Sequence, residues 1–115
     1  AYFQALDRRA EVVVADLAEG LRTEANYLLT SAAIEVRAQV FYPLYDRCLA
    51  AGRAGFSVAA ITKDEDRHLG EMKDGLARVV GDWRPRLEAV LEAERSLFGG
   101  FLEAMEAAMV VQRAA

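Results

Sequence analysis

The stretch KDEDRHL, residues 63–69, holds the only histidine of the chain, three residues after a glutamate. Positions i and i+3 of a helix lie on one face, so Glu65 and His68 can offer a carboxylate oxygen and an imidazole nitrogen to one metal ion. The apolar residues from Val58 to Val79 repeat with the same helical period, which places both side chains inside the stripe that faces a core. Because an unpaired carboxylate is costly to bury, this pair predicts a site with a bound partner.

The composition favours an all-helical fold. Of 115 residues, 54% are hydrophobic, and only two are proline and eight glycine, so few residues would break a helix. The length suits a single domain with one modest core. The first four residues, AYFQ, resemble the remnant of a protease-site tag, so we expect the domain to comprise residues 5–115.

The charge and cysteine content narrow the expected partners and the setting. The net charge is -4, with 14 basic and 18 acidic residues well mixed, so no basic surface is expected for nucleic acid or an anionic membrane. Cys48 is the only cysteine and cannot form an internal disulfide. The sequence shows no signal-peptide pattern and no apolar run of membrane-spanning length, so a cytoplasmic setting is expected.

Helical periodicity predicts the elements. A first amphipathic helix covers residues 5–19 and ends near Gly20, unless the stripe continues as one helix over residues 5–50, which would be about 70 Å long and would require a second subunit. Pro43 should bend the second helix. Further helices are expected at residues 57–80 and 85–113. The pair Gly99-Gly100 marks a bend, a break or a close approach of another backbone.

Two further acids lie in predicted buried stripes. Glu35 follows Leu28 and Ala32 on the apolar side of the second helix, and Glu94 lies between Leu91 and Phe98 on the last helix. Several uncompensated carboxylates in one core are strongly unfavourable. The sequence therefore predicts that these acids share a metal ion or pair with arginines.

Two segments carry a family resemblance. The run EVRAQVFYP, from Glu35 through Tyr42 to Pro43, is followed by a glycine hinge and then by EDRH, from Glu65 to His68. This order resembles the Glu-x6-Tyr and Glu-x-x-His pair of the ferritin-like superfamily and is most similar to rubrerythrins. The resemblance covers residues 35–72.

The resemblance implies an all-α, ferritin-like up-and-down helical bundle with a carboxylate and histidine metal site. It implies that Glu35, Glu65, His68 and Glu94 are metal ligands. It also implies that Tyr42, the catalytic candidate, lies next to these ligands without binding the metal. The metal would be iron, as a dinuclear centre, or manganese. The implied activity is that of an oxidoreductase that oxidises Fe(II) or reduces peroxide or dioxygen. Electrons would come from an external donor, since the chain lacks a Cys-x-x-Cys pair.

The sequence also departs from the family pattern. A complete site has a second Glu-x-x-His, and this chain has no second histidine; the segment from Glu24 to Tyr27 has the spacing but lies more than two turns before Glu35. With the hinge at Gly52, Glu35 and Glu65 would differ in height along the bundle by about 6 Å.

Three ways to complete the site remain. A symmetric homodimer can bring two half-sites together, the chain can bind a single metal, or the constellation can be a relic. We expect the homodimer, because association would cover the apolar face of an incomplete bundle. The alternative function is a non-catalytic helical dimerisation or adaptor module whose buried acids pair with Arg37, Arg67 or Arg95.

Overall fold

The computed structural model describes residues 2–51 and 59–114 and, within them, an all-helical fold without strands. The helices are α1 (Tyr2–Val13), α2 (Glu19–Ala51), α3 (Ala59–Val79) and α4 (Trp83–Ala114). The prediction of an all-α fold is therefore confirmed, and of its two versions, one with four helices and one with three, the structure has the version with a short N-terminal helix and three long helices. The predicted connection around Gly52 and the cap at Ser57 lie outside the described residues.

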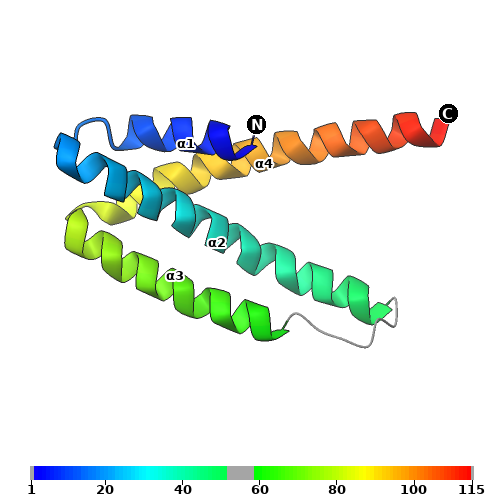
Figure 1. Ribbon diagram of the computed structural model, residues 1–115. Helices are drawn as coiled ribbons and strands as arrows, with labels where there is room; N and C mark the ends of the chain where they lie inside the picture. Colours follow the sequence, from blue (N-terminus) through cyan, green and yellow to red (C-terminus); the bar gives the residue numbers. More distant parts are fainter. Residues whose placement is uncertain (1, 52–58, 115) are drawn as a thin grey trace.

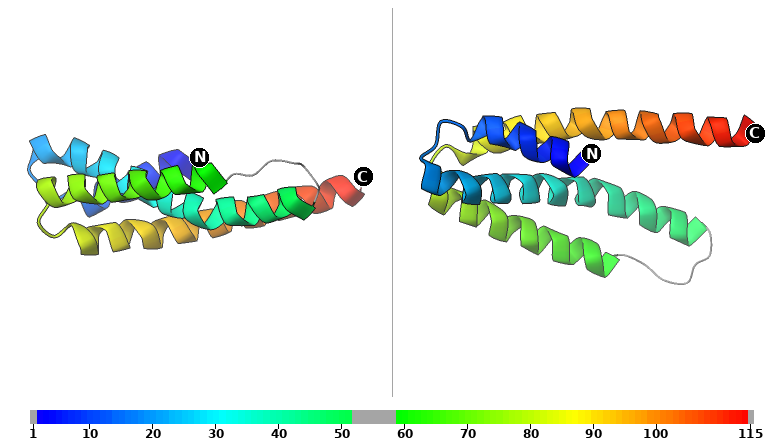
Figure 2. Two further views of the ribbon diagram at one scale, coloured as in Figure 1. Left: turned by 90° about the horizontal axis from the view of Figure 1, so that it is seen from below. Right: turned by 45° about the horizontal axis from the view of Figure 1, so that its top comes forward.

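The four helices meet at the end that holds the α1–α2 and α3–α4 turns, which we call the joined end (Figure 1). Toward the opposite end, which we call the spread end, α2 and α3 diverge from α4. α2 packs along α3 and also contacts α1 and α4, while α1 lies along α4. The right view of Figure 2 shows α2 and α4 diverging, and it shows the C-terminal part of α4 extending past the end of α1 that lies along it. The radius of gyration is 16.8 Å, whereas a compact domain of this length has a radius of about 13 Å.

The hydrophobic core occupies the joined end. Its buried apolar side chains come from all four helices and from the turns beside them: Leu6, Ala10, Val14, Ala25, Leu29, Ala32, Ala33, Leu69, Leu76, Val80, Leu87, Val90 and Leu91. Ala25, Ala32 and Ala33 of α2 are fully buried, which lets the other helices approach its backbone closely. On α3 the buried stripe runs through Leu69 and Leu76, one position on from the predicted His68.

The break between α1 and α2 was predicted, but its position was not. α1 ends at Val13, earlier than the expected Gly20, and Gly20 lies in the first turn of α2. Arginine side chains satisfy the carbonyls that the early end exposes: Arg86 donates to Val13 O at 2.7 Å and Arg22 to Leu17 O at 2.8 Å.

The other predicted interruptions lie inside continuous helices. α2 continues through Pro43, and α4 continues through Gly99 and Gly100. A Cβ atom added at either glycine of α4 would meet nothing within 4 Å. The two glycines therefore neither break the helix nor make room for any other described part of the chain.

Candidate functional site

Among the acids whose side chains the structure describes, Glu94 is the buried one, and Arg37 pairs with it. Its residue exposure is 2%, and Arg37 donates from Nε to Oε1 and from Nη2 to Oε2, both at 2.8 Å. Tyr2 adds a hydrogen bond from its hydroxyl to Oε1 at 2.7 Å. Both carboxylate oxygens are thus engaged by donors from two other helices, and the bidentate geometry fixes the spacing of α2 and α4.

The aromatic rings beside this pair strengthen the arrangement. The Arg37 guanidinium lies 4.0 Å from the centroid of the Phe98 ring, a geometry that favours the cation. Hydrogen bonding to Glu94 raises the pKa of Arg37. Burial and, secondly, the hydrogen bond to Glu94 raise the pKa of Tyr2 well above its ordinary range, so Tyr2 remains a neutral donor.

Tyr2 was missed at the sequence level because residues 1–4 were set aside as a tag remnant. In the structure, residues 2–4 belong to α1, and the Tyr2 ring packs edge-on against Phe98. No signal in the sequence linked Tyr2 to Glu94, since the two residues meet only because α1 lies along α4.

The other predicted ligands lie on α2 and α3. Gln39 donates to Asp66 at 2.5 Å, and Leu28 lies over Gly75. Because antiparallel helices advance in opposite directions, these contacts place Glu35 level with residues 68–70, and so level with His68. Glu65 lies about 5–7 Å further along α3. This offset agrees with the height difference expected from the sequence.

Glu35 has an unsatisfied oxygen. Its Oε2 atom is buried and accepts no hydrogen bond within the described part of the chain, while His68 is half-buried on the facing helix. Glu65 and Tyr42 lie in α3 and α2, but their side chains are outside the described set. Among the described residues, no group of three histidine, cysteine, aspartate or glutamate side chains is arranged to hold a metal ion.

An apolar groove borders the Arg37–Glu94 pair where α2 and α4 begin to diverge. The groove has a volume of about 320 Å³. Its lining comes from α1, α2 and α4: Tyr2, Phe3, Ile34, Arg37, Ala38, Phe41, Phe98 and Phe101. Phe41 and Phe101 are each 47% exposed, which is unusual for aromatic residues beside a core. We call this hollow the apolar groove.

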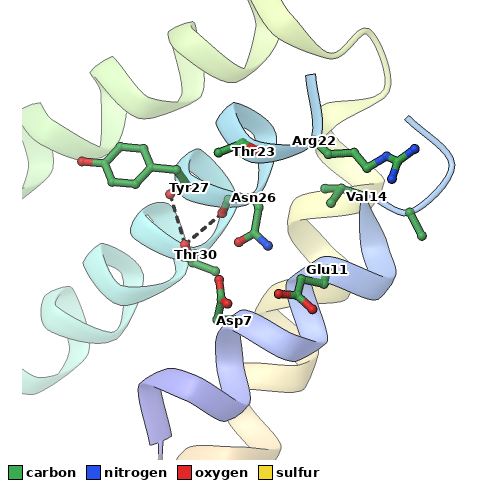
Figure 3. A pocket seen from close by; sticks show the side chains of 9 residues that line it. Asp7, Glu11, Val14, Arg22, Thr23, Asn26, Tyr27 and Thr30 are labelled. Atoms are coloured by element: carbon green, nitrogen blue, oxygen red, sulfur yellow. Dashed lines mark hydrogen bonds between the residues drawn. The ribbon is translucent and has the colours of Figure 1, made fainter. Parts of the chain in front are cut away.

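A second, polar hollow lies between α1 and α2, with a volume of about 590 Å³ (Figure 3). Asp7 and Glu11 of α1 line it opposite Asn26 and Thr30 of α2. The Asn26 Oδ1 atom is buried and accepts no hydrogen bond from the described residues. Thr30 donates its hydroxyl to the carbonyl of Asn26 at 2.9 Å, and the lining combines the two acidic side chains with the guanidinium of Arg22.

Arg86 ties the joined end together. It donates to both oxygens of Asp16, at 2.6 and 2.8 Å, and to Asp82 at 2.9 Å. Its side chain is 13% exposed, whereas Asp16 is 69% exposed. Arg86 therefore links the first turn of α4 to the segment between α1 and α2.

Acid should weaken this link. Hydrogen bonding to Arg86 lowers the pKa of Asp16 from 3.8 to about 2. Below pH 3.8 the unfolded chain therefore binds more protons than the folded chain. The Asp16–Arg86 ion pair makes its full contribution to stability above that pH, and this contribution is lost as the pH falls through about 2. As the pH falls from 3.8 to about 2, we expect the melting temperature of Asp16→Asn to decrease less than that of the wild type, in thermal scans followed by circular dichroism. Asp7→Asn, an exposed acid of α1, is the control, and equal acid losses in all three proteins would contradict the assignment.

Comparisons of the chain with models of known protein families, with curated proteins and with solved structures found no match. Within the described residues, no helix combines the length and the apolar character needed to cross a membrane. The fold and the site therefore define an all-helical protein with a buried, fully paired carboxylate and an apolar groove.

Proposed function

We propose that this chain is a helical association module. Its joined end contains the hydrophobic core that stabilises the fold, and its spread end binds another helical surface. The observation that supports this proposal is the exposure of the C-terminal part of α4. Every residue from 101 to 111 is exposed, and six of them are large apolar side chains: Phe101, Leu102, Met105, Met109, Val110 and Val111. We call residues 101–111 distal α4.

An uncovered apolar helix is a costly arrangement for an isolated chain. Most of the stability of a protein helix comes from packing of its apolar face, and short helical segments are marginal in water on their own. Contiguous exposed apolar surface of this kind marks interaction sites. Distal α4 therefore gains its packing from a partner.

The paired carboxylate supports the same proposal. The bidentate contact with Arg37 neutralises Glu94 without a metal ion and holds α2 and α4 at the distance that leaves the apolar groove open. The pairing of a buried acid with arginine was the alternative to metal binding considered for the sequence. In the proposal, Glu94 has a structural role.

Hydrogen exchange tests whether the chain leaves distal α4 uncovered. In particles of one-chain mass, we expect the amides of residues 102–111 to exchange at least about a hundredfold faster than those of residues 25–33 in the core. Peptide-resolved exchange with mass spectrometry measures the difference. Strong protection of residues 102–111 in one-chain particles would show that the chain covers this segment itself, and would overturn the proposal.

A second candidate function is a single iron or manganese site on α2 and α3. The buried Oε2 atom of Glu35, which accepts no hydrogen bond from the described residues, favours it, because residue 35 lies level with residue 68 along the two helices. Glu35, Glu65 and His68 would be the ligands, with Tyr42 beyond them. Bound iron would supply redox chemistry toward dioxygen or peroxide, with electrons from an external donor, while Glu94 would remain with Arg37.

Metal addition separates the two functions. If the association module is the function, Fe(II) or Mn(II) leaves the melting temperature of chelator-treated protein unchanged. A metal site would raise it, since ligands that bind only the folded state stabilise that state. Glu65→Ala and His68→Ala would each remove such a rise, and Glu71→Ala, an exposed acid of α3, would not. Elemental analysis of protein purified without chelator gives the metal content per chain.

A further inference from the structure

Resting on the proposed function, we infer that the partner is a second copy of this chain, related by a twofold axis, with distal α4 of each copy seated in the apolar groove of the other. One chain carries both halves of this contact. Distal α4 presents an apolar helix, and the apolar groove presents aromatic side chains with open space between them. A twofold interface requires such self-complementarity, because each contact then occurs twice.

The exposed area of the chain fits this partner. A folded monomer of 12.6 kDa is expected to expose about 6,200 Å², whereas this chain exposes 7805 Å². The excess of about 1,600 Å² on each chain corresponds to about 3,200 Å² for two chains, which lies within the range of about 2,000–5,000 Å² that obligate homodimer interfaces bury. A symmetric dimer through the spread ends can therefore remove the excess without a third component.

The paired glycines of α4 provide an independent reason for a close neighbour. Gly99 and Gly100 each cost about 1 kcal/mol relative to alanine inside a helix. Nothing within 4 Å of either Cβ position in the described structure requires a glycine. Both residues lie between Phe98 and Phe101, at the mouth of the apolar groove. Glycine allows the backbone of another helix to approach closely at this point.

The aromatic residues of the groove are the expected anchors. Phe101 and Phe41 are half exposed in one chain, and a helix that enters the groove would bury both. Large aromatic side chains near the centre of an interface carry much of its binding energy. Phe101 has a double role, because it ends the groove of its own chain and begins the helix that enters the partner.

Light scattering and sedimentation over a range of concentrations test the inference. The wild type should have the mass of two chains, and Phe101→Glu combined with Met105→Glu should have the mass of one chain with unchanged helix content by circular dichroism. The milder Phe101→Ala should raise the dissociation constant at least about tenfold. Val12→Glu is the matched control, because Val12 is 75% exposed on α1 and lies outside the groove; it should remain a dimer.

Each contrary outcome is informative. A wild type with one-chain mass at every concentration would overturn the second-copy inference, and fast exchange of residues 102–111 in the same sample would leave the association module with a partner of different sequence. A dimer that survives both Phe101→Glu with Met105→Glu and Phe101→Ala would show that the copies meet on another surface. Protection of residues 102–111 in one-chain particles would overturn both proposals.

Discussion

Replacing Arg37 by methionine is expected to lower the free energy of unfolding by about 3–5 kcal/mol. The substitution removes both donors that hold the carboxylate oxygens of Glu94, which is 2% exposed. Only the Tyr2 hydroxyl would remain bound to that carboxylate among the partners described. A buried charge without compensation is strongly unfavourable, and this cost exceeds the value of the pair in the wild type.

Urea denaturation at neutral pH measures this effect, and a double variant identifies its cause. Arg37→Met combined with Glu94→Leu removes the stranded charge together with its partner, so it should recover most of the lost stability. The interaction energy from the resulting cycle should be several times that of Arg95→Met with Glu92→Gln, an exposed pair at 3.0 Å within α4. A loss below about 1 kcal/mol for Arg37→Met would show that Glu94 is solvated or satisfied in another way.

The same pair shows how far the sequence determines the site. The apolar stripe of α4 correctly predicted that Glu94 is buried, and it required a partner for the charge. Arg37 was one of three candidate arginines, and only the packing of α2 against α4 selects it. Tyr2 could not be found in this way, because local periodicity carries no information about a contact between residues 92 positions apart.

The ends of the helices also show where local sequence signals stop being sufficient for prediction. The sequence predicts the helices and their approximate ends because apolar periodicity and turn residues are local signals. The end of α1 at Val13 is set by a distant side chain, since Arg86 caps the free carbonyl. Gly20 and the Gly99-Gly100 pair suggested interruptions, but both lie within helices in the structure.

The predicted metal ligands show the same contrast: their heights along the helices could be predicted from the sequence, whereas their burial could not. Register between α2 and α3 follows from a short connection, so the height of Glu35 relative to Glu65 was predictable from residue counts. Burial was less predictable, because the α3 stripe that packs against α2 runs through Leu69 and Leu76 and leaves His68 at its edge. A shift of one residue turns a helix face by about 100°, which decides whether a side chain points into the core or along its border.

Replacing Leu29 by alanine is expected to lower the free energy of unfolding by about 2–5 kcal/mol. Leu29 is fully buried in α2, among core residues from every helix. The buried alanines of α2 have no side-chain atoms beyond Cβ that could move into the space, so the cavity should remain largely open. Leu21→Ala, 40% exposed at the start of α2, is the matched control and should change stability by less than about 1 kcal/mol.

The Leu29 variant also separates folding from association. The described buried apolar residues lie at the joined end and include none from distal α4 and none that lines the apolar groove, whose Tyr2 packs against the edge of this core. Leu29→Ala should therefore destabilise the fold without changing the dissociation constant of the remaining folded chains. Phe101→Ala should raise the dissociation constant without changing the stability of the single folded chain. Urea denaturation at several protein concentrations distinguishes the two effects, because only association makes the midpoint depend on concentration. If Leu29→Ala weakened the dimer as strongly as Phe101→Ala, the two ends of the bundle would form one cooperative unit, contrary to the division that the burial pattern indicates.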